Sequence, residues 1–163
     1  MIEVLIEDER WVGIGLEALC GPAGKAAMAV TGRDEKGFEL ALLATDDRHI
    51  AKLNRDFRGK PEATNVLSWP AQEDSPQLGH GQGVELGDIA IAYETCVREA
   101  AEKGISVQGH VTHLLIHGIL HLLGYDHISD VDAEEMETLE IKALAKLGID
   151  NPYWEYNSTE KEP

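Results

Sequence analysis

The sequence predicts a single domain of the α/β class (α+β type), in which helices pack on a small mixed sheet of about four strands. Three observations support this fold. The length of 163 residues suits one domain, the composition of 43% hydrophobic and 27% charged residues is ordinary for a globular protein, and short strand-like runs are mixed with longer segments of helical spacing. A chain of this size buries about two thirds of its surface on folding, so a metal ion would serve function rather than stability.

The first half of the chain predicts two strands and two helices. Ile2, Val4 and Ile6 alternate with Glu3, Leu5 and Glu7, the period of a strand with one buried face. Residues 38–44 form an apolar run of strand length. Residues 11–29 have helical spacing, but the Gly-Pro-Ala-Gly sequence at 21–24 predicts an interruption. A helix over residues 46–57 follows the second run, with Thr45-Asp46-Asp47 supplying its cap.

The second half predicts two strands and three helices. The strands are residues 66–69, which Pro70 closes, and 86–92, and the Gly-, Pro-, Gln- and Ser-rich residues between them predict a flexible loop over 71–83. Each of the three helices is expected to end at a glycine: Gly104, Gly124 or Gly148. They cover residues 93–103, 107–123 and 131–147, the last capped by Ser129 or Asp130. The domain is expected to span residues 1–150, with residues 151–163 as a loose tail.

A nucleotide-binding parallel fold is less favoured. Residues 13–18 match a loose G-x-G-x-x-A, but Glu7-Asp8-Glu9-Arg10 separate these glycines from the preceding strand. In dinucleotide-binding proteins the glycines form the turn between strand and helix itself. The motif therefore carries little weight.

The formal charge of −16 excludes a basic protein that coats nucleic acid. The charges are unevenly distributed, because residues 48–60 hold five of the 14 basic residues whereas residues 129–163 are strongly acidic. The five are Arg48, Lys52, Arg55, Arg58 and Lys60. They can form a local anion-binding surface, although some can equally be the solvated face of an ordinary helix. Arg58 stands out because the helix gives way there to Gly59-Lys60-Pro61, which frees its side chain to reach a phosphate.

Cysteine content and hydropathy indicate a cytoplasmic protein. Cys20 and Cys96 lack metal-site or redox spacing and are interpreted as small buried residues. The first residues lack a cationic start followed by an apolar stretch, and no window approaches 18 apolar residues. No membrane partner is expected.

Three histidines predict a metal site. His117 and His121 are four residues apart and share one helix face, Gly124 ends that helix, and the turn at Tyr125-Asp126 can bring His127 back to the same point. Three imidazoles with an open fourth position are typical of catalytic zinc. The alternative is that such a pair arises by chance on a half-buried face, but the third histidine after the glycine favours the metal.

The other histidines are assigned elsewhere. His113 lies too far along the helix to share the ion, and we assign it to packing or to a supporting role; His49, His80 and His110 are expected on the surface or in loops. Asp126 either orients an imidazole or forms a turn. Metalloproteases with H-E-x-x-H use the glutamate as base, and Gly118 replaces it here, which disfavours peptide hydrolysis.

The segment from His117 to His127, His-Gly-Ile-Leu-His-Leu-Leu-Gly-Tyr-Asp-His, resembles the signature of the YbeY family of bacterial metal-dependent endoribonucleases. Two further blocks resemble the family in the same order: residues 54–60 with 64–70, and residues 86–92. The family usually has Asp and Phe where this chain has Asn65 and Trp69. Asn65 leaves no negative charge at its position, whereas Trp69 is expected to affect packing.

The resemblance implies a zinc ion held by His117, His121 and His127, and an arginine important for activity, Arg58. It implies cleavage of single-stranded RNA in the cytoplasm, in forming the 3′ end of 16S rRNA and in ribosome quality control. The implied partners are rRNA, the small ribosomal subunit with its proteins, and assembly GTPases. The hypothetical mechanism combines metal activation of water or phosphate, with His117 and His121 among the catalytic residues, and charge stabilisation by Arg58.

Two other functions stay open from the sequence. One is a zinc hydrolase of another substrate class. The other is a ribosome-assembly binding factor whose metal is largely structural. The sequence leaves undetermined the metal used in the cell, the RNA cleavage site, the general base and the oligomeric state.

Overall fold

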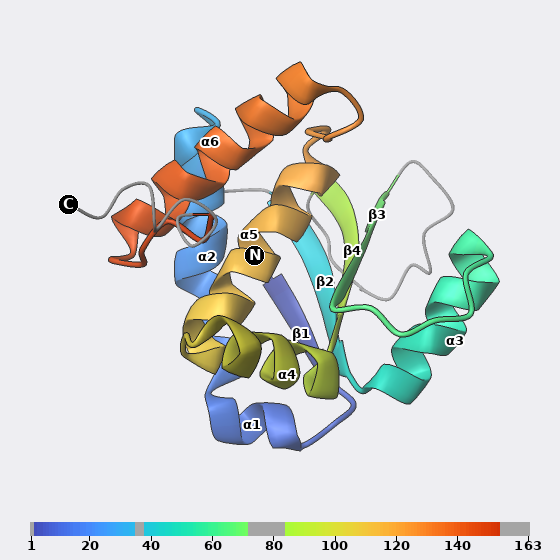
Figure 1. Ribbon diagram of the computed structural model, residues 1–163. Coiled ribbons are helices and arrows are strands. Elements are labelled where there is room, and N and C mark those ends of the chain that lie inside the picture. The colour runs from blue at the N-terminus through green and yellow to red at the C-terminus, as the bar shows by residue number, and fades with distance from the viewer. Residues whose placement is uncertain (1, 35–37, 72–83, 154–163) are drawn as a thin grey trace.

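A four-stranded mixed sheet with helices on both faces forms the molecule in the computed structural model, which describes residues 2–34, 38–71 and 84–153 (Figure 1). The strands run β1-β2-β4-β3 across the sheet. The first three are parallel to one another, and β3 pairs antiparallel with β4 as an edge strand. Their bounds are Ile2–Ile6 (β1), Phe38–Thr45 (β2), Val66–Pro70 (β3) and Val84–Ala92 (β4). The mixed α/β prediction is confirmed.

Six helices accompany the sheet within the described residues. Their bounds are Arg10–Ile14 (α1), Leu16–Val30 (α2), Asp47–Arg58 (α3), Tyr93–Lys103 (α4), Val107–Leu122 (α5) and Asp130–Lys146 (α6). The residues that directly precede α3, α5 and α6 cap these helices: Asp46, Ser106 and Ser129 accept hydrogen bonds from the backbone N–H three residues on. None of these helices combines the length and hydropathy that a membrane crossing requires.

The two faces of the sheet bury different cores. The larger core joins α2, α5 and α6 to one face, which Leu40, Leu42 and Ile89 line. On the other face, a smaller cluster packs α3 through Ile50 and Leu53. Alternate strand residues point to opposite faces, so a single stretch of β2 or β4 serves both cores. The helix α5 is almost wholly buried, and its C-terminal half passes beside β3 (Figure 1).

The interruption predicted at residues 21–24 is wrong, because α2 continues through them and the break lies at Gly15. Gly15 has a φ of 80°, which separates α1 from α2. Pro22 costs the carbonyl of Ala18 its helical partner, but both residues are exposed, so water replaces that bond. The buried stripe that includes Leu16 and Cys20 keeps α2 on the core.

Two predicted segments lie largely outside the described residues. The predicted loop over 71–83 falls in 72–83, and most of the predicted tail falls in 154–163. Of the tail, residues 151–153 are described, and Tyr153 donates a hydrogen bond to Glu140 on α6. This contact becomes part of the site below.

Candidate metal centre and cleft

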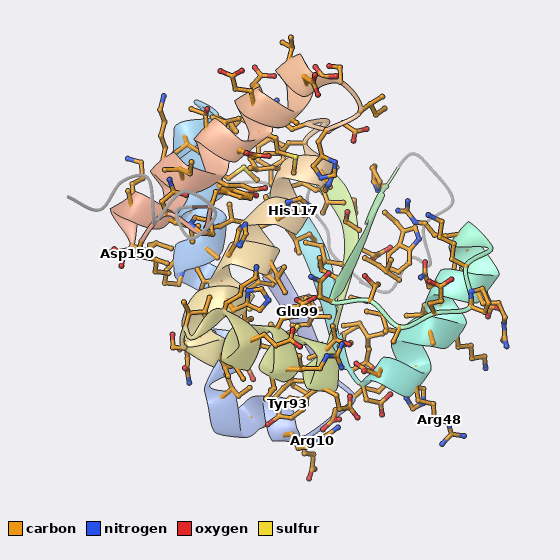
Figure 2. The ribbon with its side chains drawn as sticks, viewed as in Figure 1. Arg10, Arg48, Tyr93, Glu99, His117 and Asp150 are labelled. Atoms are coloured by element: carbon orange, nitrogen blue, oxygen red, sulfur yellow. The ribbon has the colours of Figure 1, made fainter. Side chains whose placement is uncertain are left out.

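The helix α5 carries His117 and His121 one turn apart, on one side of its C-terminal end, and Figure 2 labels His117 there. Most of α5 from His110 to Leu122 is buried, which fixes the rotation of the helix and thereby the direction of both imidazoles. The helix stops at Leu122, and Gly124, with a φ of 102°, reverses the chain. The short turn that follows returns His127 to the two helical histidines.

The three imidazoles converge. One nitrogen from each of His117, His121 and His127 lies within 4.8 Å of the others. The Nε2 atoms of His117 and His121 are 3.1 Å apart. Two nitrogens bound to one tetrahedral zinc ion at about 2.05 Å would lie about 3.3 Å apart. The spacing therefore fits a shared ion, as the sequence spacing predicts.

A buried carboxylate orients His117. Glu140 on α6 is fully buried, and its Oε2 accepts a hydrogen bond from Nδ1 of His117 at 2.5 Å. Because Nδ1 carries the proton, the Nε2 lone pair is free to face the other histidines. The second carboxylate oxygen lies 2.8 Å from Nε2 of His113 and also accepts from the Tyr153 hydroxyl. Glu140 is thus held by three partners.

The electrostatics of the cluster favour neutral histidine beside an ionised glutamate. Burial and repulsion from His117 and His127 lower the pKa of His121 to about 4, so this imidazole stays neutral at physiological pH. Burial opposes ionisation of Glu140, but the hydrogen bonds from His113 and His117 outweigh it and hold its pKa at about 2. Neutral imidazole is the form that binds a metal ion.

Gly118 packs against the sheet and leaves no room for a side chain. A Cβ on Gly118 would lie 3.0 Å from Cδ1 of Ile89, which is fully buried. A glutamate at this position, as in H-E-x-x-H, would have to enter the core between α5 and β4. The structure therefore gives a physical reason why this helix lacks the base of the metalloproteases.

A cleft of about 540 Å³ joins His117 and His121 to Arg58. Its lining includes His117 and His121 from α5, Asp126 from the turn, and Ser68 on β3. Arg58, at the last position of α3, is exposed, donates to the carbonyl of Ser68, and its guanidinium carbon lies 5.9 Å from the Trp69 ring centroid. A guanidinium has five N–H donors, so donors remain for an anion in the cleft. Arg58 and the two helical histidines, far apart in sequence, thus line one cleft.

The remaining histidines differ in their surroundings. His113 supports Glu140, in line with its predicted supporting or packing role. The surface prediction for His110 is wrong, because His110 is 1% exposed and its Nε2 lies 2.9 Å from Glu99 of α4. His49 is exposed as predicted, and His80 lies outside the described residues. The Asp126 carboxylate accepts a hydrogen bond from the backbone N–H of the next residue, His127, a local contact within the turn.

Asn65 has a specific partner. Its Nδ2 donates to Oε1 of Glu99 at 2.9 Å, so the amide supplies a donor that a carboxylate cannot. Burial opposes ionisation of Glu99, but the hydrogen bonds from Asn65 and His110 lower its pKa. The aromatic ring of Trp69 is buried and meets Phe57 edge-on at 5.9 Å between centroids. Both positions therefore have structural roles beside the cleft.

Sequence reasoning missed Glu140 and Tyr153. Glu140 is one of many acidic residues near the C-terminus, and Tyr153 lies in the predicted tail. A signal for Glu140 was present, because the buried residues Met136, Glu140, Ala143 and Leu144 follow the spacing of one helix face. A charged residue on such an apolar stripe requires a buried partner.

The fold also occurs in a solved structure. The solution structure of a Thermotoga maritima protein aligns with a TM-score of 0.60 and 24% sequence identity, over 98% of this chain and 93% of that one. At this identity the likeness concerns the fold alone.

Sequence comparison is more specific. A protein of Dinoroseobacter shibae named endoribonuclease YbeY is 48% identical, over 93% of this chain and 90% of its own length. A protein of the same name from Cereibacter sphaeroides is 47% identical, over 94% of this chain and 98% of its own length. The model of the family described as endoribonuclease YbeY matches residues 21–148, which contain α3, β3, β4 and all three converging histidines. This chain belongs to the endoribonuclease YbeY family.

Proposed function

We propose that this protein is a zinc-dependent endoribonuclease that cleaves single-stranded RNA in the cleft between α5, β3 and the end of α3. The observation that carries the proposal is that two of the three converging imidazoles, those of His117 and His121, line the same cleft as the exposed guanidinium of Arg58. Relatives named endoribonuclease YbeY, 47–48% identical over most of the chain, support RNA as the substrate. Zinc is proposed because a ligand set of three imidazoles suits that ion.

His117, His121 and His127 would hold the metal. When bound, the ion supplies a Lewis acid that polarises a phosphoryl oxygen and lowers the pKa of coordinated water. Glu140 keeps the proton of His117 on Nδ1 and so presents Nε2 to the ion. His113 and the Tyr153 hydroxyl hold Glu140 in that position.

Arg58 would bind the phosphate that is cleaved. Its contact with the Ser68 carbonyl and its place over the Trp69 ring fix the guanidinium at the wall of the cleft. Hydrogen bonds from this group to the phosphoryl oxygens stabilise the charge that develops as the phosphodiester bond breaks. Because the side chain is already held, little conformational entropy is lost when substrate binds.

The proposed cellular role follows from the family. We propose that the protein acts in the cytoplasm in rRNA processing, including maturation of the 16S rRNA 3′ end and ribosome quality control. The small ribosomal subunit with its proteins and assembly GTPases are its proposed partners. Delivery by such partners would help a chain of charge −16 to approach RNA.

The test compares wild type with Arg58→Ala and His121→Ala on a single-stranded RNA that carries an rRNA precursor 3′ end. His121→Ala is expected to lose both the metal and cleavage. Arg58→Ala is expected to keep the metal and lose about 10²–10³-fold in cleavage rate. Arg98→Ala, which removes an exposed arginine of α4, is the matched control and should cleave like wild type. Cleavage by His121→Ala at the wild-type rate would refute the proposal.

A further inference from the structure

The outward side of α3 carries a row of three cationic side chains, Arg48, Lys52 and Arg55, which we call the α3 stripe. Their spacing of four and three residues places them on one face of the helix. All three are exposed, and Figure 2 shows Arg48 projecting away from the body of the molecule. The opposite side of α3 packs Ile50 on the sheet. The stripe is therefore held rigidly at the surface.

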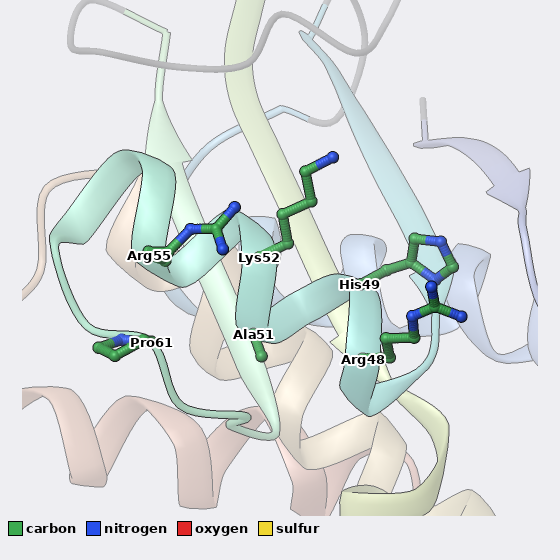
Figure 3. Close-up of a pocket in the computed structure, with 6 residues that line it drawn as sticks. All are labelled: Arg48, His49, Ala51, Lys52, Arg55 and Pro61. Atoms are coloured by element: carbon green, nitrogen blue, oxygen red, sulfur yellow. The ribbon is translucent and has the colours of Figure 1, made fainter.

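The α3 stripe lines a hollow. A pocket of about 320 Å³ is bounded by the three cationic residues together with His49, Ala51 and Pro61 (Figure 3). The chain reaches Pro61 just after α3 ends, and it forms the far side of this pocket. Two carboxylates offset part of the charge: Asp56 lies 3.1 Å from Nε of Arg55, and Asp46 lies 2.7 Å from Nδ1 of His49.

The stripe continues to the proposed active-site cleft. Arg58, which lines that cleft, follows Arg55 by three residues on the same helix. At a rise of about 1.5 Å per residue, Arg48 and Arg58 lie about 15 Å apart along the helix axis. One rigid helix thus carries cationic groups from the cleft outward. Elsewhere the chain is strongly acidic, with a formal net charge of −16.

We propose that the α3 stripe binds the backbone phosphates of single-stranded RNA beyond the cleaved bond and so guides the strand into the cleft. This proposal deepens the proposed function and rests on it. Exposed cations continuous with a phosphate site suit the regular charges of an RNA strand. A membrane fits less well, because a helix that binds a bilayer exposes an apolar face, whereas Ile50 and Leu53 of α3 pack on the sheet.

The expected effect is salt-dependent. Each phosphate contact on a single strand contributes about 0.7 to the slope of log affinity against log salt, so three contacts contribute about 2. Between 50 and 200 mM salt, wild-type affinity should therefore fall about 20-fold more than the affinity of a protein that lacks the stripe. Bases are not read by these contacts, so the loss should be similar for different RNA sequences.

The experiment measures binding of a long single-stranded RNA that is methylated at every 2′-oxygen, by fluorescence anisotropy. The test variant is Arg48→Gln with Lys52→Gln and Arg55→Gln. The control variant is Lys25→Gln with Lys142→Gln and Lys146→Gln. It removes three exposed positive charges from α2 and α6 and has the same net charge as the test variant. We expect the test variant to lose about 2 from the salt slope and the control to match wild type.

A third variant guards against misfolding. Arg48→Lys with Arg55→Lys keeps the charges of the α3 stripe and should bind like wild type. The proposal is overturned if the test variant binds the RNA with an affinity within twofold of wild type at 50 mM salt. The same result is expected if the stripe binds an acidic protein instead of RNA. Equal loss in the control variant would also overturn it, because net charge alone would then explain binding.

Cleavage assays separate this proposal from the proposed function. A short RNA that spans only the cleft should be cut at equal rates by wild type and the test variant, whereas a long RNA should be cut more slowly by the test variant at low RNA concentration. If wild type cuts neither RNA, the proposed function fails, but the binding result on the methylated strand still decides the role of the stripe. If the test variant cuts both RNAs like wild type, the stripe proposal fails while the proposed function stands.

Discussion

Replacing Glu140 by Gln tests the buried network that positions the proposed metal ligands. The change keeps the size of the side chain but removes the charge that accepts hydrogen bonds from His113 and His117. In the folded protein the pKa of Glu140 is about 2, against an ordinary value of 4.5. That difference corresponds to about 3 kcal/mol of stability at pH 7, and Gln, which retains one acceptor oxygen, should lose about 2–3 kcal/mol of it.

The pH dependence has a definite sign. A carboxyl whose pKa is lowered by folding contributes stability that is fully present above 4.5 and is lost as the pH falls toward 2. Wild type and Glu140→Gln should therefore differ most above pH 5, and the difference should disappear only as the pH falls toward 2. Urea unfolding of the metal-free proteins at a series of pH values measures this difference directly.

The same change should weaken metal binding. Without the carboxylate, the proton of His117 is no longer held on Nδ1, and loss of such a partner typically costs 10–100-fold in metal affinity. Competition with a chromogenic chelator gives the zinc affinity. Glu135→Gln, an exposed glutamate of the same helix, is the control and should match wild type in both assays. The positioning role of Glu140 is refuted if Glu140→Gln binds zinc as well as wild type and its free energy of unfolding lies within about 0.5 kcal/mol of wild type. That threshold is about one third of the smallest contribution expected of a charged hydrogen bond.

Three further predictions concern the surrounding structure. Asn65→Asp places a second carboxylate against Glu99 and should lower the free energy of unfolding by about 1–3 kcal/mol, measured with urea at pH 7. Adding Glu99→Gln should restore most of this stability, and no restoration would contradict the pairing of the two residues. Gly87→Ala should destabilise by about 3 kcal/mol or more, because φ is 141° and the new Cβ would lie 2.0 Å from a backbone oxygen of β3; a stable variant would exclude this backbone geometry. Burial raises the pKa of both Cys20 and Cys96 to about 12, so neither thiol should react with a disulfide reagent at pH 8 until the protein unfolds, and rapid labelling of the native protein would contradict their burial.

Local sequence signals predicted most helices and strands. Ser129 caps α6, Gly104 follows the end of α4, and Pro70 ends β3, because caps and stops depend on backbone chemistry within a few residues. The rule for proline failed at Pro22, where the tertiary burial of one face of α2 outweighs the loss of a single exposed hydrogen bond.

The candidate site was only partly readable from the sequence. The histidine cluster could be predicted because His117 and His121 lie on one helix and His127 follows after a short turn, so local geometry brings them together. Glu140 contributes from α6, and its role depends on how two helices pack, which no local pattern specifies. The burial of His110 depends in the same way on Glu99 of α4.

Zinc-dependent cleavage is tested by reconstitution: the protein is stripped of metal with a chelator, and zinc is titrated back while cleavage of single-stranded RNA and bound zinc are followed together. Stripped protein should be inactive, and activity should rise with zinc and saturate at about one ion per chain. His127→Ala should recover neither zinc binding nor cleavage. Cleavage by stripped protein, or wild-type activity in His127→Ala, would contradict zinc-dependent cleavage.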